Sequence, residues 1–330
     1  MAENIDLSQL NMPDEELFAP VDINELESEK ITAPRYSYWQ SVFRVFFRKK
    51  INTIVLVLLA VLLVFTYVYP KVIGYDAGNG GDRFDNQGKP GTANLDPGQA
   101  IDKFGFDVKW LFGTGSIGES TFDAVWYGAS ISVSLALACA AINLTIGIIL
   151  GAIWGFSKKM DIIMQEIYNV VANVPYVLLI AVLALVLDRS FGTMVFALTV
   201  TGWMGIAYFI RTQVIIIRDR EYNLASRCLG TPIWRIATKN ILPFMTSVIV
   251  TLAATEIPSY ISYEVFLSYI NIGLTDMSLG KLIQTAQGGM MGVIGKWPFW
   301  TPVAVASTIT VVLHIVGQNL GDASDPRTHM

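Results

Sequence analysis

Long stretches without a charged residue alternate with short polar segments along this chain. The apolar runs cover residues 51–70, 124–157, 167–187, 190–210, 240–255 and 297–321. A helix needs about 20 residues to cross about 30 Å of hydrocarbon, and most of the runs reach this length. The fifth run is short only because Glu256 interrupts it, and the apolar character resumes through Ile270. The pattern predicts an all-α membrane protein with six spanning helices.

Composition supports the membrane assignment and isolates one unusual segment. Apolar residues make up 53% of the 330 residues and charged residues 15%, whereas soluble domains carry about 25% charged residues. Nine acidic residues and no basic residue lie between Met1 and Glu29. Such a composition predicts a solvated, disordered tail over residues 1–36, and it accounts for the negative net charge of the chain.

The distribution of basic residues predicts the orientation. With the N-terminus inside, 15 of the 23 Lys and Arg residues lie in cytoplasmic segments, as the positive-inside rule requires. Both termini are then cytoplasmic, the second as a short tail over residues 322–330. Residues 37–70 form an interfacial, aromatic and basic lead-in helix and the first span. Residues 71–126 form an extracytoplasmic loop, and residues 127–321 form a core of five spans.

No cleavable signal peptide is expected, because the first apolar run begins at residue 51 and is too long for one. Within the core, the polar segment 218–243 has a regular pattern. Glu221 to Leu229 has helical composition, Gly230 offers the freedom of a turn, and Pro232 suits the first turn of a second short helix.

This segment resembles the coupling loop of ATP-binding cassette (ABC) importer permeases. The family pattern reads Glu-Ala-Ala, three residues, Gly, nine residues, Ile, one residue, Leu-Pro, and here it starts at Leu224. The family Glu falls on Leu224 and the family Ile on Asn240, so the carboxylate contact is expected to pass to Glu221, on nearly the same helix face. The resemblance implies docking on a separate ATPase subunit through Glu221, Leu224, Ala225, Ser226, Gly230, Leu242 and Pro243. The alternative is a juxtamembrane helix that binds only lipid headgroups.

Three further segments are similar to dipeptide and oligopeptide permeases. The residues before and within the second run match Phe-Gly-Thr-Asp-x-x-Gly-Arg-Asp and Tyr-Gly-Ala-Arg at Phe112, Gly113, Thr114, Gly118, Tyr127, Gly128 and Ala129. The end of the fifth run echoes Glu-Ala-Ala-Leu-Ser-Phe-Leu-Gly-Leu-Gly and Ser-Trp-Gly at Glu264, Leu267, Ser268, Gly273, Ser278 and Gly280. The ending Gly321-Asp322-Ala323-Ser324-Asp325-Pro326-Arg327 resembles that of the second (C) subunit of the oligopeptide permease.

The resemblance implies the type I ABC importer permease fold in a bacterial cell membrane, and a non-catalytic subunit that forms half of a pathway for oligopeptides. Its expected partners are a second homologous permease, two cytoplasmic ABC ATPases, an extracytoplasmic peptide-binding protein and the lipid bilayer, with no nucleic acid. The sequence holds no Gly-x-x-x-x-Gly-Lys-Ser/Thr phosphate loop, so ATP and Mg²⁺ are expected on the ATPase subunits. No cofactor or metal is expected in this chain.

Two carboxylates mark the fifth span as the candidate substrate path. Glu256, Tyr260 and Glu264 follow one another at intervals of four residues and share one helix face. A charged side chain at the centre of a bilayer costs about 2.5–3.5 kcal/mol, so these groups should face protein or water. The alternative to a path is a contact with the partner permease or a cap at the outer mouth. Pro258 predicts a kink between the carboxylates, and Pro175 a bend in the third span.

Other functions fit the sequence less well. A permease of the same family for dipeptides, nickel or glycans is the nearest alternative, because such importers share this permease type and only the finer resemblance favours oligopeptides. A secondary transporter usually shows two related halves, and no internal repeat is visible here. An intramembrane metalloenzyme lacks support, because there is no His-Glu-x-x-His and the two histidines, His314 and His329, are not placed to share a metal.

Overall fold

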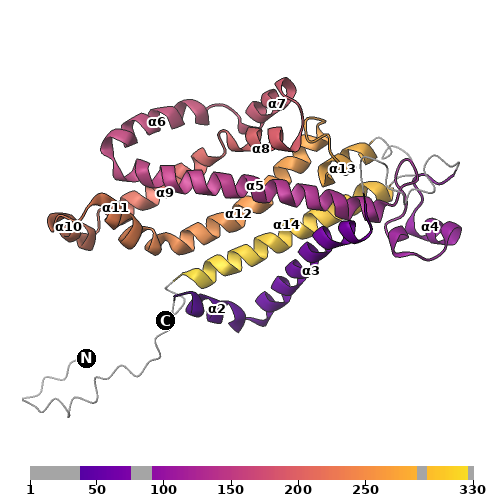
Figure 1. The fold of residues 1–330 in the computed structure, drawn as a ribbon, viewed down its shortest axis with the longest axis horizontal. Helices are drawn as coiled ribbons and strands as arrows, with labels where there is room; N and C mark the ends of the chain where they lie inside the picture. The colour runs from indigo at the N-terminus through magenta and orange to yellow at the C-terminus, as the bar shows by residue number, and fades with distance from the viewer. Residues whose placement is uncertain (1–37, 76–90, 288–295, 326–330) are drawn as a thin grey trace, which may run out of the picture. The chain divides into compact units, whose positions relative to one another are not determined.

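The computed structural model describes residues 38–75, 91–287 and 296–325, and the chain divides into the units Met1–Ser41 and Val42–Met330 (Figure 1). The acidic tail and Arg327 therefore lie outside the described residues. The α-helices are α2 (Tyr38–Arg48), α3 (Lys50–Val72), α4 (Pro97–Phe104), α5 (Thr121–Phe156), α6 (Lys158–Ala172), α7 (Tyr176–Val186), α8 (Phe191–Thr199), α9 (Trp203–Arg218), α10 (Glu221–Cys228), α11 (Ile233–Ile236), α12 (Thr246–Tyr269), α13 (Leu279–Gln287) and α14 (Lys296–Ser324). A π-helical turn (Ala237–Ile241) and a 3-10 turn (Pro243–Met245) lead from α11 into α12.

The predicted spans correspond to these helices. Five segments of the described chain are long and apolar enough to cross a membrane, and they contain α3, α5, the pair α8 and α9, α12, and α14. The pair α6 and α7 is a sixth span if it is counted as one, bent by 75° at its break. Pro175 lies at this break, where its ring and missing N–H end α6. The all-α fold and the bend in the third span are thus confirmed, whereas α12 continues through Pro258 without a break.

Local capping explains where several helices begin. The Ser120 side chain accepts a hydrogen bond from the Asp123 amide at the start of α5. Ser157 ends α5 and its side chain caps α6 by accepting from the Met160 amide. Ser190 caps α8 in the same way. Each of these serine hydroxyls satisfies a backbone donor that the first helical turn leaves without a partner.

Small residues let the spans approach one another closely. Gly147, Gly151 and Gly155 form a stripe along α5 at intervals of four residues and face α9. A Cβ atom added at Gly151 would lie 2.5 Å from the Ala207 carbonyl oxygen, so no larger side chain fits there without displacement. Such stripes are a standard means of association in lipid, where packing rather than burial from water holds helices together.

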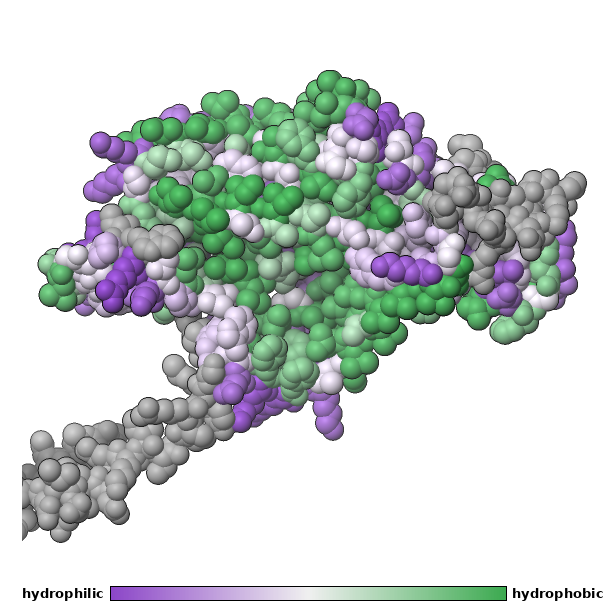
Figure 2. All heavy atoms as spheres, viewed as in Figure 1, coloured by the Kyte–Doolittle hydropathy of each residue, from purple (hydrophilic) through white to green (hydrophobic). Residues whose placement is uncertain are grey.

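The surface agrees with a membrane environment. Exposed Ile, Leu and Val side chains lie along α3, including Ile54, Val57, Val61 and Val64. Figure 2 shows mostly hydrophobic surface over the middle of the spans and hydrophilic surface around α10 and around α4. Helices α10 and α11 lie at one end of the long helices, and α4 and α13 lie at the other (Figure 1). The two ends present the polar surfaces that a bilayer would separate.

Candidate functional site

The segment after α9 forms two short helices joined by a glycine turn, as the sequence predicts. Helix α10 ends at Cys228, and Gly230 follows with φ of +78°, in the left-handed region that favours glycine. The Thr231 amide donates to the Ser226 carbonyl at 3.1 Å and closes the turn. Pro232 precedes α11 and its carbonyl accepts from the Arg235 amide at 2.9 Å. The backbone of this turn is therefore fixed by its own hydrogen bonds.

The same turn presents apolar side chains to the outside. Leu224 is 45% exposed and Leu229 is 85% exposed. Ala225 and Glu221 are also exposed, and Ser226 is half-buried. Pro243 is exposed and Leu242 half-buried at the far end of the segment. We call residues 221–243 the knob. Its exposed apolar side chains with a polar rim have the composition of a protein-docking surface.

A buried amide fixes this knob to the membrane helices. Asn223 is fully buried; its side-chain amide donates to the Ile217 carbonyl at the end of α9 (2.8 Å), and its carbonyl oxygen accepts from the Asn240 amide (3.2 Å). Asn240 therefore pairs with Asn223 at the position where the family pattern has Ile. The sequence alone did not predict a role for Asn223. The available signal was the presence of two amide side chains, Asn223 and Asn240, in a segment whose other residues are mostly apolar or charged.

An apolar cluster completes the attachment. Ile206, Ile210, Val214 and Ile217 of α9 pack in one buried group with Ile236, Ile241 and Met245 from the second half of the segment. The knob and α9 thus share one core. A displacement of the knob would be carried by α9, since a close-packed cluster resists independent movement of its parts.

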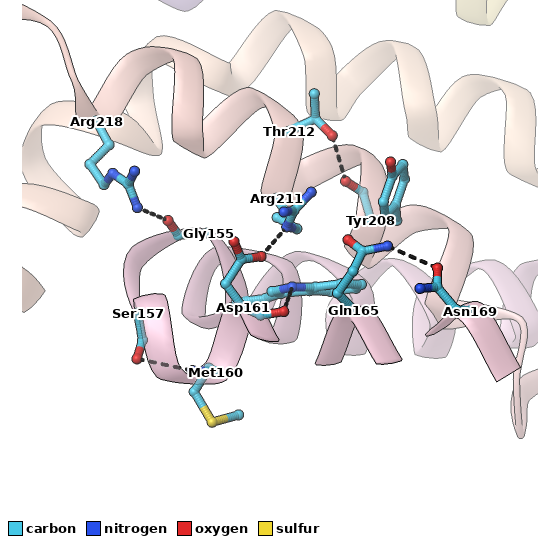
Figure 3. Close-up of polar contacts among 11 residues, drawn as sticks. Gly155, Ser157, Met160, Asp161, Gln165, Asn169, Tyr208, Arg211, Thr212 and Arg218 are labelled. Atoms are coloured by element: carbon cyan, nitrogen blue, oxygen red, sulfur yellow. Dashed lines mark hydrogen bonds and ion pairs between the residues drawn. The ribbon is translucent and has the colours of Figure 1, made fainter. Parts of the chain in front are cut away.

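A second polar cluster ties α9 to the turn between α5 and α6 (Figure 3). The Arg211 guanidinium pairs with the Asp161 carboxylate and lies over the Trp154 ring, 5.3 Å from its centroid. The Trp154 indole N–H donates to the Asp161 carbonyl at 3.3 Å. Tyr168 of α6 stacks on Tyr208 of α9 with centroids 4.5 Å apart. We call these residues the α5–α6–α9 latch.

Arg218 extends this attachment by about two more turns, to the end of α9. It donates to the Gly155 carbonyl at 2.7 Å and to the Asp219 carboxylate at 2.9 Å. The hydrogen bond from Arg218 lowers the pKa of Asp219, because it stabilises the charged carboxylate. Sequence reasoning used these basic residues only to orient the chain. Asp219 is a neighbour of Arg218 in the chain, but Asp161 and Gly155 lie fifty or more positions from their partners, so no local pattern reveals those two contacts.

A pocket of about 420 Å³ lies against the break between α6 and α7. Glu256 and Tyr260 of α12 line it, as predicted for the candidate path, although Tyr260 is only 2% exposed. Three more tyrosines line the pocket, namely Tyr168, Tyr176 and Tyr263. Thr201 and Ser259 also line it. The pocket is therefore polar and aromatic in a region where the surrounding helices are apolar.

Glu264, the third residue expected in the path, does not line this pocket. It is fully buried and accepts hydrogen bonds from the Ser132 (2.7 Å), Ser268 (2.9 Å) and Ser278 (2.6 Å) hydroxyls. Gly280 approaches so closely that an added Cβ would lie 2.8 Å from the Glu264 carboxylate. The carboxylate thus joins α5, α12 and the residue before α13 through hydrogen bonds within this chain.

Comparison with known proteins gives a consistent result. Residues 143–330 match the family described as "Binding-protein-dependent transport system inner membrane component". The chain is 41% identical over 325 residues to the oligopeptide transport system permease protein AmiD of Streptococcus pneumoniae, covering 96% of this chain and 98% of that protein.

Two other relatives cover nearly the whole chain. The dipeptide transport system permease protein DppC of Lactococcus lactis is 31% identical, over 91% of this chain and 94% of its own length. The oligopeptide transport system permease protein OppC of Bacillus subtilis is 30% identical, over 96% of this chain and 98% of its own length. The similarity therefore extends well beyond the matched family segment.

Proposed function

Because the chain belongs to the family of binding-protein-dependent transport system inner membrane components, we propose that it is the multi-pass permease subunit of a bacterial ABC importer for peptides, and for oligopeptides in particular. The observation that carries this proposal is the 41% identity to an oligopeptide permease over 96% of the chain. Two relatives named as dipeptide permeases support the dipeptide alternative, but they are only 31% and 29% identical to this chain.

The proposed complex contains a second homologous permease, two ABC ATPases that bind ATP and Mg²⁺, and an extracytoplasmic peptide-binding protein. This chain supplies half of the pathway and carries out no catalysis. Both termini and the knob then lie in the cytoplasm, where the ATPases are. The exposed Leu224 and Leu229 support a docking role for the knob, since apolar side chains in water favour burial in a partner.

The internal contacts suggest how the knob acts on the pathway. Asn223 and the apolar cluster join the knob to α9, and the α5–α6–α9 latch joins α9 to α6. Tyr168 belongs to this latch and also lines the pocket beside Glu256. We therefore propose that closure of the ATPases moves the knob and α9 together, and that α6 passes the displacement to the pocket wall.

In this account Glu256 and Tyr260 belong to the substrate path, while Glu264 holds the fold together. The open side of the pocket is the place where the second permease would complete the path. If the knob instead binds only lipid headgroups, it makes no specific contact with an ATPase. Removing it would then leave the amount of bound ATPase unchanged.

Isolation of the tagged chain from its native membrane tests the proposal. An ABC ATPase should co-purify with the chain in mild detergent, and deletion of Glu221 to Gly230 should remove the ATPase while the second permease stays bound. A preparation without any ATPase, or one whose ATPase survives the deletion, would contradict the proposed coupling.

A further inference from the structure

The pocket beside Glu256 has a lining that fits one kind of chemical group. Four of its lining residues are tyrosines, one is a carboxylate, and none of the fifteen is basic. Aromatic faces and a carboxylate together are the groups that bind ammonium ions in proteins, through cation–π attraction and charge pairing. Building on the proposed function, we infer that this pocket binds the positively charged amino terminus of the peptide during its passage.

The position of Glu256 supports a role at mid-membrane. Helix α12 runs from Thr246 to Tyr269, and Glu256 lies ten residues from its start. At about 1.5 Å per residue, the carboxylate lies some 15 Å from one end of the helix, near the middle of about 30 Å of hydrocarbon. A charge at that depth is costly, and a cation that enters the pocket offsets the cost.

The helix ends at the pocket do not supply a competing positive charge of the same size. The C-terminal end of α6 and the N-terminal end of α7 meet at Pro175, and residues from both line the pocket. Their dipole ends carry opposite partial charges of about half an elementary charge and offset one another. The start of α9 also lies here, but the Met204 amide already donates to the Thr201 carbonyl at 3.0 Å. A charged Glu256 carboxylate would exceed these partial charges.

Three of the four tyrosines form a connected aromatic wall. The Tyr176 and Tyr263 rings pack edge to face with centroids 5.3 Å apart, and Tyr263 also contacts the Tyr260 ring at 6.2 Å. The Tyr176 hydroxyl is held by the Leu198 carbonyl at 2.7 Å, and the Tyr260 hydroxyl accepts from Asn143 at 2.5 Å. Because their hydroxyls are fixed by the protein, these side chains are already in place before a ligand enters.

The choice of the amino terminus follows from what all peptides share. An importer that accepts many side chains needs a recognition element that does not depend on sequence. The terminal ammonium is such a group, and it fits a site of tyrosines and one carboxylate. Side-chain preference would then lie elsewhere in the complex.

The test compares uptake of tri-alanine with uptake of N-acetyl-tri-alanine by the complete complex in proteoliposomes. The Glu256→Gln variant keeps the shape and removes the charge, and Glu166→Gln makes the same change at an exposed residue outside the pocket. We expect the preference for the free amino terminus to fall by about tenfold or more in Glu256→Gln, which corresponds to ~1.4 kcal/mol, and to be unchanged in Glu166→Gln. Any contribution of the binding protein is the same in all three complexes and cancels from the comparison.

The outcomes separate the inference from the function on which it rests. If the wild-type complex imports peptides and Glu256→Gln keeps the same preference, the inference is wrong and the proposed function stands. If the wild-type complex imports no peptide with ATP present, the proposed function itself is wrong.

Should Glu256→Gln fail to assemble, a second measurement decides. Ser259→Cys, in a chain whose exposed Cys228 is replaced by Ser, places a thiol on the pocket lining. Free tri-alanine should slow labelling of this thiol severalfold, and the acetylated peptide should not. Equal protection by the two peptides, or none by either, would overturn the inference.

Discussion

The turn at Gly230 offers a test in which strain and steric clash are separated. Gly230 has φ of +78°, and a Cβ added there would have no heavy atom within 4 Å. A substitution is therefore opposed by backbone strain alone. For an L-residue with a Cβ the left-handed conformation costs about 1–2 kcal/mol, more for β-branched residues and less for Asn.

These costs predict an order among three variants of Gly230. Val should disturb the turn most, Ala should follow, and Asn should come closest to wild type. A cost of 1–2 kcal/mol lowers the ratio of correctly formed to unformed turns by about 5- to 30-fold. Asn223 holds α10 to α9, and the apolar cluster holds the end of α11 and the residues after it to α9, both independently of the turn, so the membrane subunits should still assemble.

The assay is peptide-stimulated ATP hydrolysis together with uptake, both on reconstituted complexes. Stimulation and uptake should fall in the order Asn, Ala, Val, while the yield of assembled complex stays level. Normal uptake and normal stimulation in Gly230→Val would show that the turn does not transmit the motion of the ATPase. Equal losses for Asn and Val would refute the role of backbone strain.

Three further predictions concern topology, the latch and the buried carboxylate. Gln99→Cys should react with an impermeant thiol reagent from outside the cell and Lys159→Cys should not; reversed labelling would overturn the orientation. In a double-mutant cycle on uptake, Arg211→Ala and Asp161→Ala should be non-additive, with a coupling of about 0.5–1 kcal/mol because the pair is partly exposed; additive losses would remove this link from the latch. Glu264→Ala should leave three serine hydroxyls without their acceptor and lower the thermal stability and yield of the chain, at about 1–3 kcal/mol per orphaned group; a normal yield with impaired uptake would instead return Glu264 to the path.

Much of the fold follows from local sequence patterns. The charge-free runs place four of the spans to within about three residues, since hydrocarbon excludes charge over most of each crossing. The third and fourth spans are longer than their runs, because α6 begins at Lys158 and α9 continues to Arg218 through charged residues near the ends of the crossing. Pro175 located the break in the third span, and Gly230 with Pro232 located the turn between α10 and α11. Each of these features depends on residues that are neighbours in the chain.

The residues that join separate helices could not be found in this way. Glu264 has the same helical spacing as Glu256, yet it is buried and accepts a hydrogen bond from Ser132, which lies 132 positions away in the chain. This contact is why we give Glu264 a structural role and not a place in the path. Arg211 forms an ion pair with Asp161, which lies fifty positions away in the chain. Helical periodicity places a residue on a face, but only the packing of the helices determines which face meets which.

Some predictions concern partners that are separate chains. The contacts of Glu221, Leu242 and Pro243 with an ATPase remain proposals, as do the second permease and the binding protein. The exposed surface of the knob and the position of Glu256 in the pocket are the features of this chain on which those proposals depend.

Whether this chain serves an ATP-driven importer is decided by the uptake of a labelled oligopeptide into proteoliposomes that contain the complete complex, measured with and without ATP and with an ion gradient alone. We expect uptake that requires ATP hydrolysis, is stimulated by the peptide-binding protein and is indifferent to the gradient. Uptake that follows an ion gradient without ATP would identify a secondary transporter and refute the proposed ABC importer.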